Sequence, residues 1–251
     1  MRKIKIVVLH KKVLFAIAIT LIIIIFGAIF ICKCSSNSWE NVFVDPNSGI
    51  IVIDPGHGGI DGGTSWDRML EKDINLDVSL KIKKYLEKEG YTVVMTRDSD
   101  ISLENLSDVG GSRHARDLNA RMHIINNGNA QLFLSIHVNS HLNNLEADGS
   151  IIFYNNNYLQ NKTLAHSIQS SLNSMTVDGE KRTIHDPQIG NYFLLKHSKI
   201  PGVIVEIAFI SNTAERNLLM HDKFKDEIAQ SIIRGIKRYF YEQNSAVKGD
   251  N

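Results

Sequence analysis

The chain of 251 residues is long enough for one sizeable globular domain with additional segments, and its net charge is +1. Residues 1–35 hold six of the 28 basic residues and no acidic one, so the rest carries 22 basic against 27 acidic residues, a net charge of −5. A mildly acidic domain without a basic stripe argues against nucleic acid as the main partner, and we expect no nucleic-acid binding.

The first predicted element is an apolar run over 13–32 that contains no charged residue. At 1.5 Å per residue such a run spans about the 30 Å hydrocarbon core of a bilayer. We expect a basic flank (1–12), a transmembrane signal-anchor (13–32) and a linker (33–47). The basic flank predicts that the N-terminus lies inside and the remainder on the extracytoplasmic side of the cell membrane. The alternative is secretion after cleavage of a signal peptide, although the run lacks the usual small-residue cleavage pattern.

A catalytic domain is expected over 48–243, with a polar tail over 244–251. Apolar runs predict strands over 50–53, 91–97, 130–138, 149–154 and 202–210, and a shorter apolar run covers 192–195. Amphipathic patterns predict helices from the N-cap Asp73 to Gly90, over about 113–127 and 157–174, after Asn212, and from Asp222 onward. The segments 98–112 and 176–190 are polar and lack periodicity. Apolar strands alternating with amphipathic helices predict an α/β sheet that is covered on both faces.

Four polar side chains interrupt this pattern at or near the ends of elements. His57 follows the first strand in "VIDPGHGGIDGG", His137 lies near the end of the third strand, and Glu206 lies inside the last strand. Glu71 precedes the predicted N-cap of the first helix. Each has an ordinary explanation: a turn residue, a hydrogen-bonded core histidine, an ion-pair partner, or an acid that stabilises a helix start. Together, two histidines and Glu71 can also form the His₂Glu set of a catalytic zinc site, which would leave Glu206 free to act on water.

The positions of the cysteines and glycines further restrict the kind of catalytic site that the domain can contain. Cys32 and Cys34 are the only cysteines, so the domain has neither a disulfide framework nor a thiol nucleophile. The five glycines of residues 56–63 permit sharp turns and leave room for a metal and a bulky substrate beside His57. A phosphate-binding loop is the competing interpretation, but the segment has neither a P-loop lysine nor a G-x-G-x-x-G motif.

Four segments in this order carry a family resemblance: "VIDPGHGGIDGG", "LEKDINLDVSLKIKKYLEKEGYTVVMTRDSD", "LFLSIHVNS" and "IPGVIVEIAFISN". From about Ile50 to Phe240 the sequence resembles the zinc-dependent N-acetylmuramoyl-L-alanine amidases of bacteria. The resemblance implies a single three-layer αβα domain with a mixed, mostly parallel sheet of about six strands. It also implies that one Zn²⁺ is bound by three side chains and that one carboxylate is catalytic. The implied ligands are His57, Glu71 and His137, and the implied catalytic residue is Glu206.

The activity implied by the resemblance is hydrolysis of the amide bond between N-acetylmuramic acid and L-alanine in peptidoglycan. A domain that directly follows an N-terminal anchor is similar to the amidases that act on the spore cortex and in germination. Asn139 and Arg182 are candidate contacts to the substrate. An activating protein partner is a further expectation, because the segments 98–112 and 176–190 offer edges that a partner could order.

Two other functions remain open at this point. A zinc peptidase of related architecture would cut between amino acids of the stem peptide rather than at the sugar. A membrane-anchored wall-binding or scaffold protein would need no chemistry, but all four polar positions are present. Analysis of the cleavage products separates these possibilities.

Overall fold

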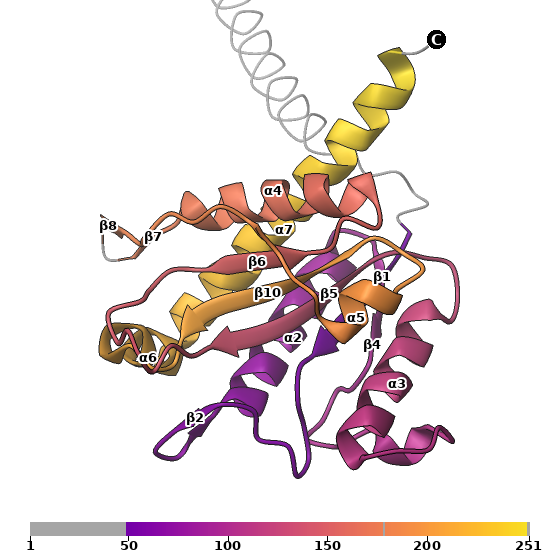
Figure 1. The fold of residues 1–251 in the computed structure, drawn as a ribbon. Helices are drawn as coiled ribbons and strands as arrows, with labels where there is room; N and C mark the ends of the chain where they lie inside the picture. The colour runs from indigo at the N-terminus through magenta and orange to yellow at the C-terminus, as the bar shows by residue number, and fades with distance from the viewer. Residues whose placement is uncertain (1–48, 178, 250–251) are drawn as a thin grey trace, which may run out of the picture. The chain divides into compact units, whose positions relative to one another are not determined.

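The computed structural model describes residues 49–177 and 179–249, and its centre is a six-stranded sheet in the order β4-β1-β5-β10-β6-β9 (Figure 1). The strands are β1 (Ile50–Pro55), β4 (Thr92–Met95), β5 (Ala130–Asn139), β6 (Ile151–Tyr154), β9 (Gln188–Ile189) and β10 (Gly202–Phe209). β4, β1, β5 and β10 are parallel, β10 pairs antiparallel with β6, and β6 pairs parallel with β9. The predicted mixed, mostly parallel sheet of six strands is therefore confirmed.

Helices cover both faces of this sheet and complete the predicted three layers (Figure 1). They are α2 (Glu71–Lys88), α3 (Arg113–Asn126), α4 (Leu159–Asn173), α5 (Phe193–His197), α6 (Thr213–Met220) and α7 (Asp222–Gly249). Successive residues of a strand point to opposite faces. Accordingly, Leu132 and Leu134 of β5 pack in the core formed with α2, α4 and α7, whereas Phe133 packs in a second core with α3 and α5. Burial on both faces explains why the strands are continuously apolar.

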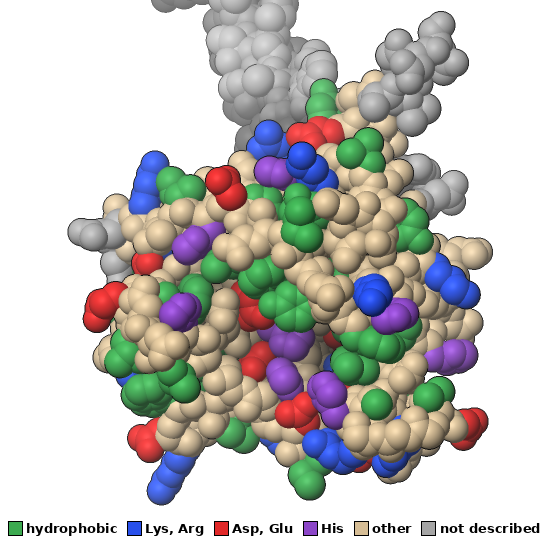
Figure 2. Space-filling view, viewed as in Figure 1, with side chains coloured by type: hydrophobic (Ala, Val, Ile, Leu, Met, Phe, Trp, Pro, Cys, Tyr) green, Lys and Arg blue, Asp and Glu red, His purple; other side chains and the backbone are tan. Residues whose placement is uncertain are grey.

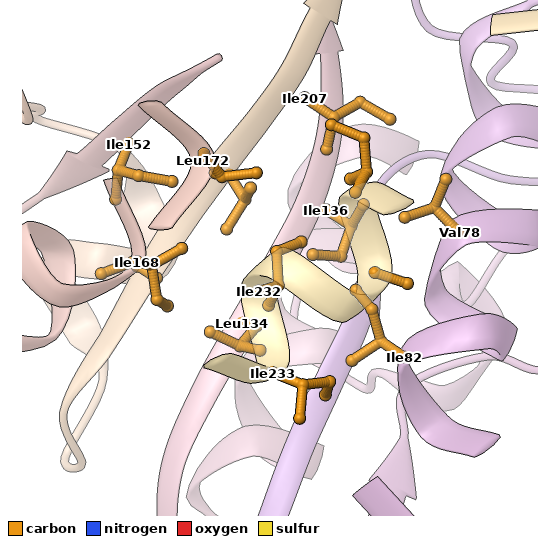
Figure 3. Packing of buried hydrophobic residues seen from close by; sticks show 14 of the residues in the cluster. Val78, Ile82, Leu134, Ile136, Ile152, Ile168, Leu172, Ile207, Ile232 and Ile233 are labelled. Carbon is orange, nitrogen blue, oxygen red and sulfur yellow. The ribbon is translucent and has the colours of Figure 1, made fainter. Parts of the chain in front are cut away.

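The larger core lies between the sheet and α7. Ile232 of α7 lies near Leu134 and Ile136 of β5 and near Val78 and Ile82 of α2 (Figure 3). All five side chains have at most 2 % of their surface exposed. Burying an aliphatic side chain of this size contributes about 1.5–3 kcal/mol, so this core stabilises the packing of α2 and α7 against the sheet.

One local prediction was wrong. The helix expected to be capped by Asp73 begins at Glu71, because the Glu71 amide already donates to Thr64 O at 3.0 Å and Leu70 takes the N-cap position. The apolar run 192–195, for which no element was predicted, supplies the N-cap Tyr192 and the first three residues of the short helix α5, which packs Leu194 and Leu195 into the second core. The predicted helix after Asn212 is confirmed as α6, because the Asn212 side chain accepts two of its first amides.

Short elements lie between the main helices and strands. β2 (Ser65–Trp66) and β3 (Met69–Leu70) form a hairpin before α2, a 3₁₀ turn covers Glu104–Leu106, and β7 (Thr176–Val177) pairs with β8 (Glu180–Lys181). The segments 98–112 and 176–190 thus hold some regular structure at the rim of the domain.

The described residues, 49–177 and 179–249, belong to one compact unit. The predicted basic flank (1–12), signal-anchor (13–32) and linker (33–47) lie outside the described residues. Within the described part of the chain, none of the helices combines the length and the hydropathy needed to cross a bilayer.

Candidate metal centre

The sheet topology brings the four singled-out side chains to one edge. β1, β5 and β10 are parallel neighbours, so their carboxyl ends meet at the same edge of the sheet. His57 follows β1, His137 lies two residues before the end of β5, and Glu206 pairs with His137 in the β10–β5 register. Glu71 enters from the first residue of α2. Figure 2 shows histidine and acidic side chains gathered in a recess near the middle of this face.

His57, Glu71 and His137 converge with metal-ligand geometry. Glu71 Oε1 lies 3.3 Å from His57 Nε2 and 2.9 Å from His137 Nδ1. The three ligand atoms all lie within 4.8 Å of one another. Zinc–nitrogen and zinc–oxygen bonds of about 2.0–2.2 Å in a tetrahedral site place ligand atoms about 3.3 Å apart, so these side chains fit a small divalent cation with little movement.

Glu71 is held as a permanent anion. Its Oε2 accepts the Thr64 amide at 2.8 Å, and its Oε1 accepts from the Asn75 side chain and the Val138 amide, both at 3.2 Å. Burial raises the pKa of Glu71, but hydrogen bonds from His137 and His57 outweigh it and hold the pKa well below its usual range. Such a carboxylate is suited to bind a cation rather than to exchange protons.

A nearby carboxylate fixes the orientation of His57. Asp61 Oδ2 accepts from His57 Nδ1 at 3.0 Å, while Asp61 Oδ1 accepts the Gly63 amide at 3.1 Å. Burial lowers the pKa of His57, but the hydrogen bonds and charges of Glu71 and Asp61 outweigh it and raise the pKa to about 9. Because a carboxylate only accepts, Nδ1 donates to Asp61, and Nε2, which lies 3.3 Å from Glu71 Oε1, is the atom that a cation would bind once it displaces the second proton. The sequence reasoning missed Asp61; an acid four residues after the histidine within the same loop was the available signal.

Two glycines let the loop backbone lie directly against the ligands. A Cβ atom on Gly56 would lie 2.2 Å from the His137 ring, and one on Gly63 would lie 2.5 Å from Glu71 Oε2. Gly63 also has a φ of +68°, and His57 itself has a φ of +60°. The left-handed conformation costs a residue with a side chain about 1–3 kcal/mol, so the surrounding contacts must hold His57 there. The glycines therefore make room for the ligands themselves.

Glu206 faces the same centre with the opposite environment. Its Oε2 is buried and has no hydrogen-bond partner among the described residues. Burial raises the pKa of Glu206 to about 7, with the Glu71 charge adding to the effect and His137 and His57 opposing it. A carboxyl group whose pKa lies near neutrality can both accept and return a proton at physiological pH.

The structure gives the two remaining candidates different surroundings. Arg182 donates through Nε and Nη2 to Glu215 Oε1 at 2.8 and 2.6 Å, and its Nη groups also reach Ser150 Oγ and Ile207 O. Its guanidinium is therefore used inside the protein, contrary to the expectation that it contacts substrate. Asn139 ends β5, and its Oδ1 accepts the Ser140 amide at 2.7 Å.

The matching family model is N-acetylmuramoyl-L-alanine amidase, over residues 51–238. The chain therefore belongs to the N-acetylmuramoyl-L-alanine amidase family. The germination-specific N-acetylmuramoyl-L-alanine amidase of Bacillus subtilis is 37 % identical over 210 residues, which cover 83 % of this chain and 87 % of that protein.

Solved structures agree with this assignment. The CwlD amidase from Clostridioides difficile, solved in complex with the GerS lipoprotein, is 33 % identical with a TM-score of 0.68, over 76 % of this chain and 98 % of that one. An N-acetylmuramoyl-L-alanine amidase from Clostridium difficile 630 is 29 % identical with a TM-score of 0.66, over 77 % of this chain and 97 % of that one.

Proposed function

We propose that the chain is a zinc-dependent peptidoglycan amidase, which hydrolyses the amide bond between N-acetylmuramic acid and the L-alanine of the stem peptide. The observation that carries this proposal is the placement of Glu206, whose buried Oε2 has no hydrogen-bond partner among the described residues, beside three converging ligand atoms. A His₂Glu set without cysteine is typical of catalytic zinc sites. Family membership supports the choice of substrate bond.

Each side chain then has a defined task. His57, Glu71 and His137 would hold the cation, and Asp61 would keep His57 in the required orientation. When bound, Zn²⁺ would lower the pKa of the attacking water and polarise the scissile carbonyl group. Glu206 would accept the proton of that water and return it to the departing amine of L-alanine. Asn139, at the end of β5, remains a candidate contact to the substrate.

The setting of this activity is also part of the proposal. A relative named germination-specific supports a role in spore-cortex or germination-related wall hydrolysis. A structural neighbour solved with a lipoprotein supports a protein partner for this chain as well. The apolar run 13–32 would anchor the domain to the membrane on the extracytoplasmic side, or would direct secretion if it is cleaved.

Product analysis tests the function directly. The purified full-length chain is incubated with peptidoglycan, with and without a chelator, and the products are identified by mass spectrometry. We expect intact stem peptides with a free L-alanine amine, their loss after chelation and their recovery with added Zn²⁺. Cuts between amino acids would instead assign a zinc peptidase, and wall binding without cleavage would assign a scaffold. Activity that survives thorough metal removal would exclude the zinc mechanism.

A further inference from the structure

A buried arginine beneath the metal-binding loop has an unusual set of partners. Arg97, two residues past β4, is 2 % exposed. Its guanidinium donates only to backbone carbonyl groups in the contacts that the structure gives it. The acceptors are Pro55 O at 3.0 Å, Gly56 O at 2.9 Å, Lys72 O at 2.9 Å and Ser99 O at 3.1 Å.

No ion pair compensates this buried charge within the described residues. The nearby carboxylates are paired with other cations: Asp54 and Asp117 lie 2.7 and 2.6 Å from Arg121, and Asp100 lies 2.7 Å from Lys72. Burial, with the like charge of Arg121 added, lowers the pKa of Arg97 to about 10. A buried guanidinium without a paired carboxylate is unfavourable for folding, and an apolar side chain would serve packing better. Arg97 therefore calls for an explanation other than stability.

The positions of its acceptors supply that explanation. Pro55 and Gly56 lead directly into His57, whereas Lys72 directly follows Glu71. One planar guanidinium thus spans the two segments that carry the first two ligands. A lysine amine in the same place is a point donor and cannot reproduce this fixed fork.

Arg121 donates to the same loop backbone as Arg97 and also reaches the next carbonyl group, that of His57. Its Nη1 donates to Pro55 O at 2.7 Å and its Nη2 donates to His57 O at 2.6 Å. Three consecutive carbonyl groups, of residues 55–57, are therefore turned toward the two guanidinium groups. This explains how His57 is kept at a positive φ.

We propose that Arg97 is a positioning residue that sets the separation of His57 and Glu71 before the cation binds, so that metal affinity depends on it. The inference rests on the proposed zinc site. It concerns the backbone that carries the ligands, because the hydrogen bonds of Arg97 go to backbone carbonyl groups and not to the ligand side chains.

The test compares zinc affinity with stability in matched variants. The full-length wild type, R97K and R182K are titrated with Zn²⁺ against a chromophoric chelator, and urea unfolding is measured with the metal removed. Arg182 is a suitable control because it is also a buried arginine, but it is ion-paired and bound outside the loop. We expect R97K to weaken zinc affinity by about 10–100-fold, the range for residues that orient metal ligands, and to alter the absorption spectrum of the Co²⁺ form. R182K should lower the urea midpoint while keeping zinc affinity within about threefold of wild type.

The outcomes separate this inference from the proposed function. If the wild type binds no Zn²⁺, the proposed function fails and the inference with it. If the wild type binds Zn²⁺ and R97K binds equally well, only the inference fails. R97Q, which removes the charge but keeps a planar donor, provides a second variant should R97K not fold, and it is expected to weaken binding similarly. Failure of both variants to fold would assign Arg97 to the fold and overturn its role in ligand spacing.

Discussion

The two glutamates of the candidate site lie in opposite environments, which lower the pKa of Glu71 and raise the pKa of Glu206. Glu71 accepts hydrogen bonds on both carboxylate oxygens, and its pKa lies far below its usual range. Glu206 has a buried oxygen without a partner, and burial raises its pKa to about 7. Two identical carboxyl groups close together thus differ in proton affinity because one is solvated by protein donors and the other is not.

The elements that carry them explain this difference. Glu71 opens a helix, and the turn before that helix supplies a free amide from Thr64. Glu206 lies in a central strand whose neighbours pair with it on both sides, at His137 and at Ile151. The backbone N–H groups around Glu206 are engaged in strand pairing, so none of them donates to its buried Oε2. The comparison predicts that Glu71 serves binding and Glu206 serves proton transfer, and each variant below tests that division.

The largest expected effect is the loss of metal binding in E71Q. Removing the negative charge while keeping the shape should weaken zinc affinity by more than about 100-fold, beyond the loss typical of residues that only orient ligands. Amidase activity at low Zn²⁺ should fall to background. The check is a chelator competition titration together with an activity assay. Wild-type affinity in E71Q would contradict the assignment of Glu71 as a ligand.

E206Q should lower the rate of hydrolysis without weakening zinc affinity. An amide cannot accept the proton, so we expect kcat to fall by about 10²–10⁴-fold, the usual contribution of a general base. Zinc affinity should stay within about threefold of wild type, because Glu206 is not a ligand. Steady-state kinetics and the same titration measure both quantities. A variant that cleaves peptidoglycan at the wild-type rate would remove Glu206 from the mechanism.

The pH dependence of the rate provides a smaller and more specific test. Protonated Glu206 cannot act as a base, so kcat/KM at saturating Zn²⁺ should fall about tenfold per pH unit on the acid side. A bound cation lowers the pKa of a nearby carboxyl group, so the midpoint should lie at or below about 7. The residual rate of E206Q should lack this acid limb. A wild-type rate that stays constant down to pH 5 would contradict the prediction.

The smallest effect concerns stability without metal. The pKa of folded Glu206 is about 7, above the unfolded value of about 4.5, so the ionised group destabilises the fold above pH 7 and has no such effect below pH 4.5. E206Q should therefore raise the free energy of unfolding of the metal-free protein by on the order of 1–3 kcal/mol at pH 8. Urea unfolding at pH 8 and at pH 4.5 measures the difference. A destabilised E206Q at pH 8 would show that the carboxylate is better compensated than its contacts indicate.

The sequence was sufficient to predict which polar side chains the fold brings together and insufficient to predict the contacts that hold them in place. His57, His137 and Glu206 could be placed together because each lies in or just after a predicted strand, and the family resemblance implied a mostly parallel sheet. Their distances, and the contrast between Glu71 and Glu206, depend on donors from Thr64 and Val138 that no periodicity reveals.

Two arginines also have contacts that the sequence did not predict. Arg182 was expected at the substrate because it is a cation in a polar segment, yet it forms a buried ion pair with Glu215. Arg97 follows an ordinary strand and gave no signal in the sequence, although its contacts reach two ligand segments. Hydrogen bonds to backbone carbonyls leave no trace in residue type, so only the three-dimensional structure identifies them.

The side chains of the candidate site come from distant parts of the chain, so a metal ion can bind them only after the domain has folded. Its members come from β1, α2, β5 and β10, and the parallel pairing of these strands requires long crossover connections. An incomplete domain cannot bring the ligands together, so a cation that binds here binds the native state and not the unfolded chain. By mass action, free Zn²⁺ at a hundred times its dissociation constant would add about 2.7 kcal/mol to the folding equilibrium. The metal supply would then raise the fraction of the domain that is folded.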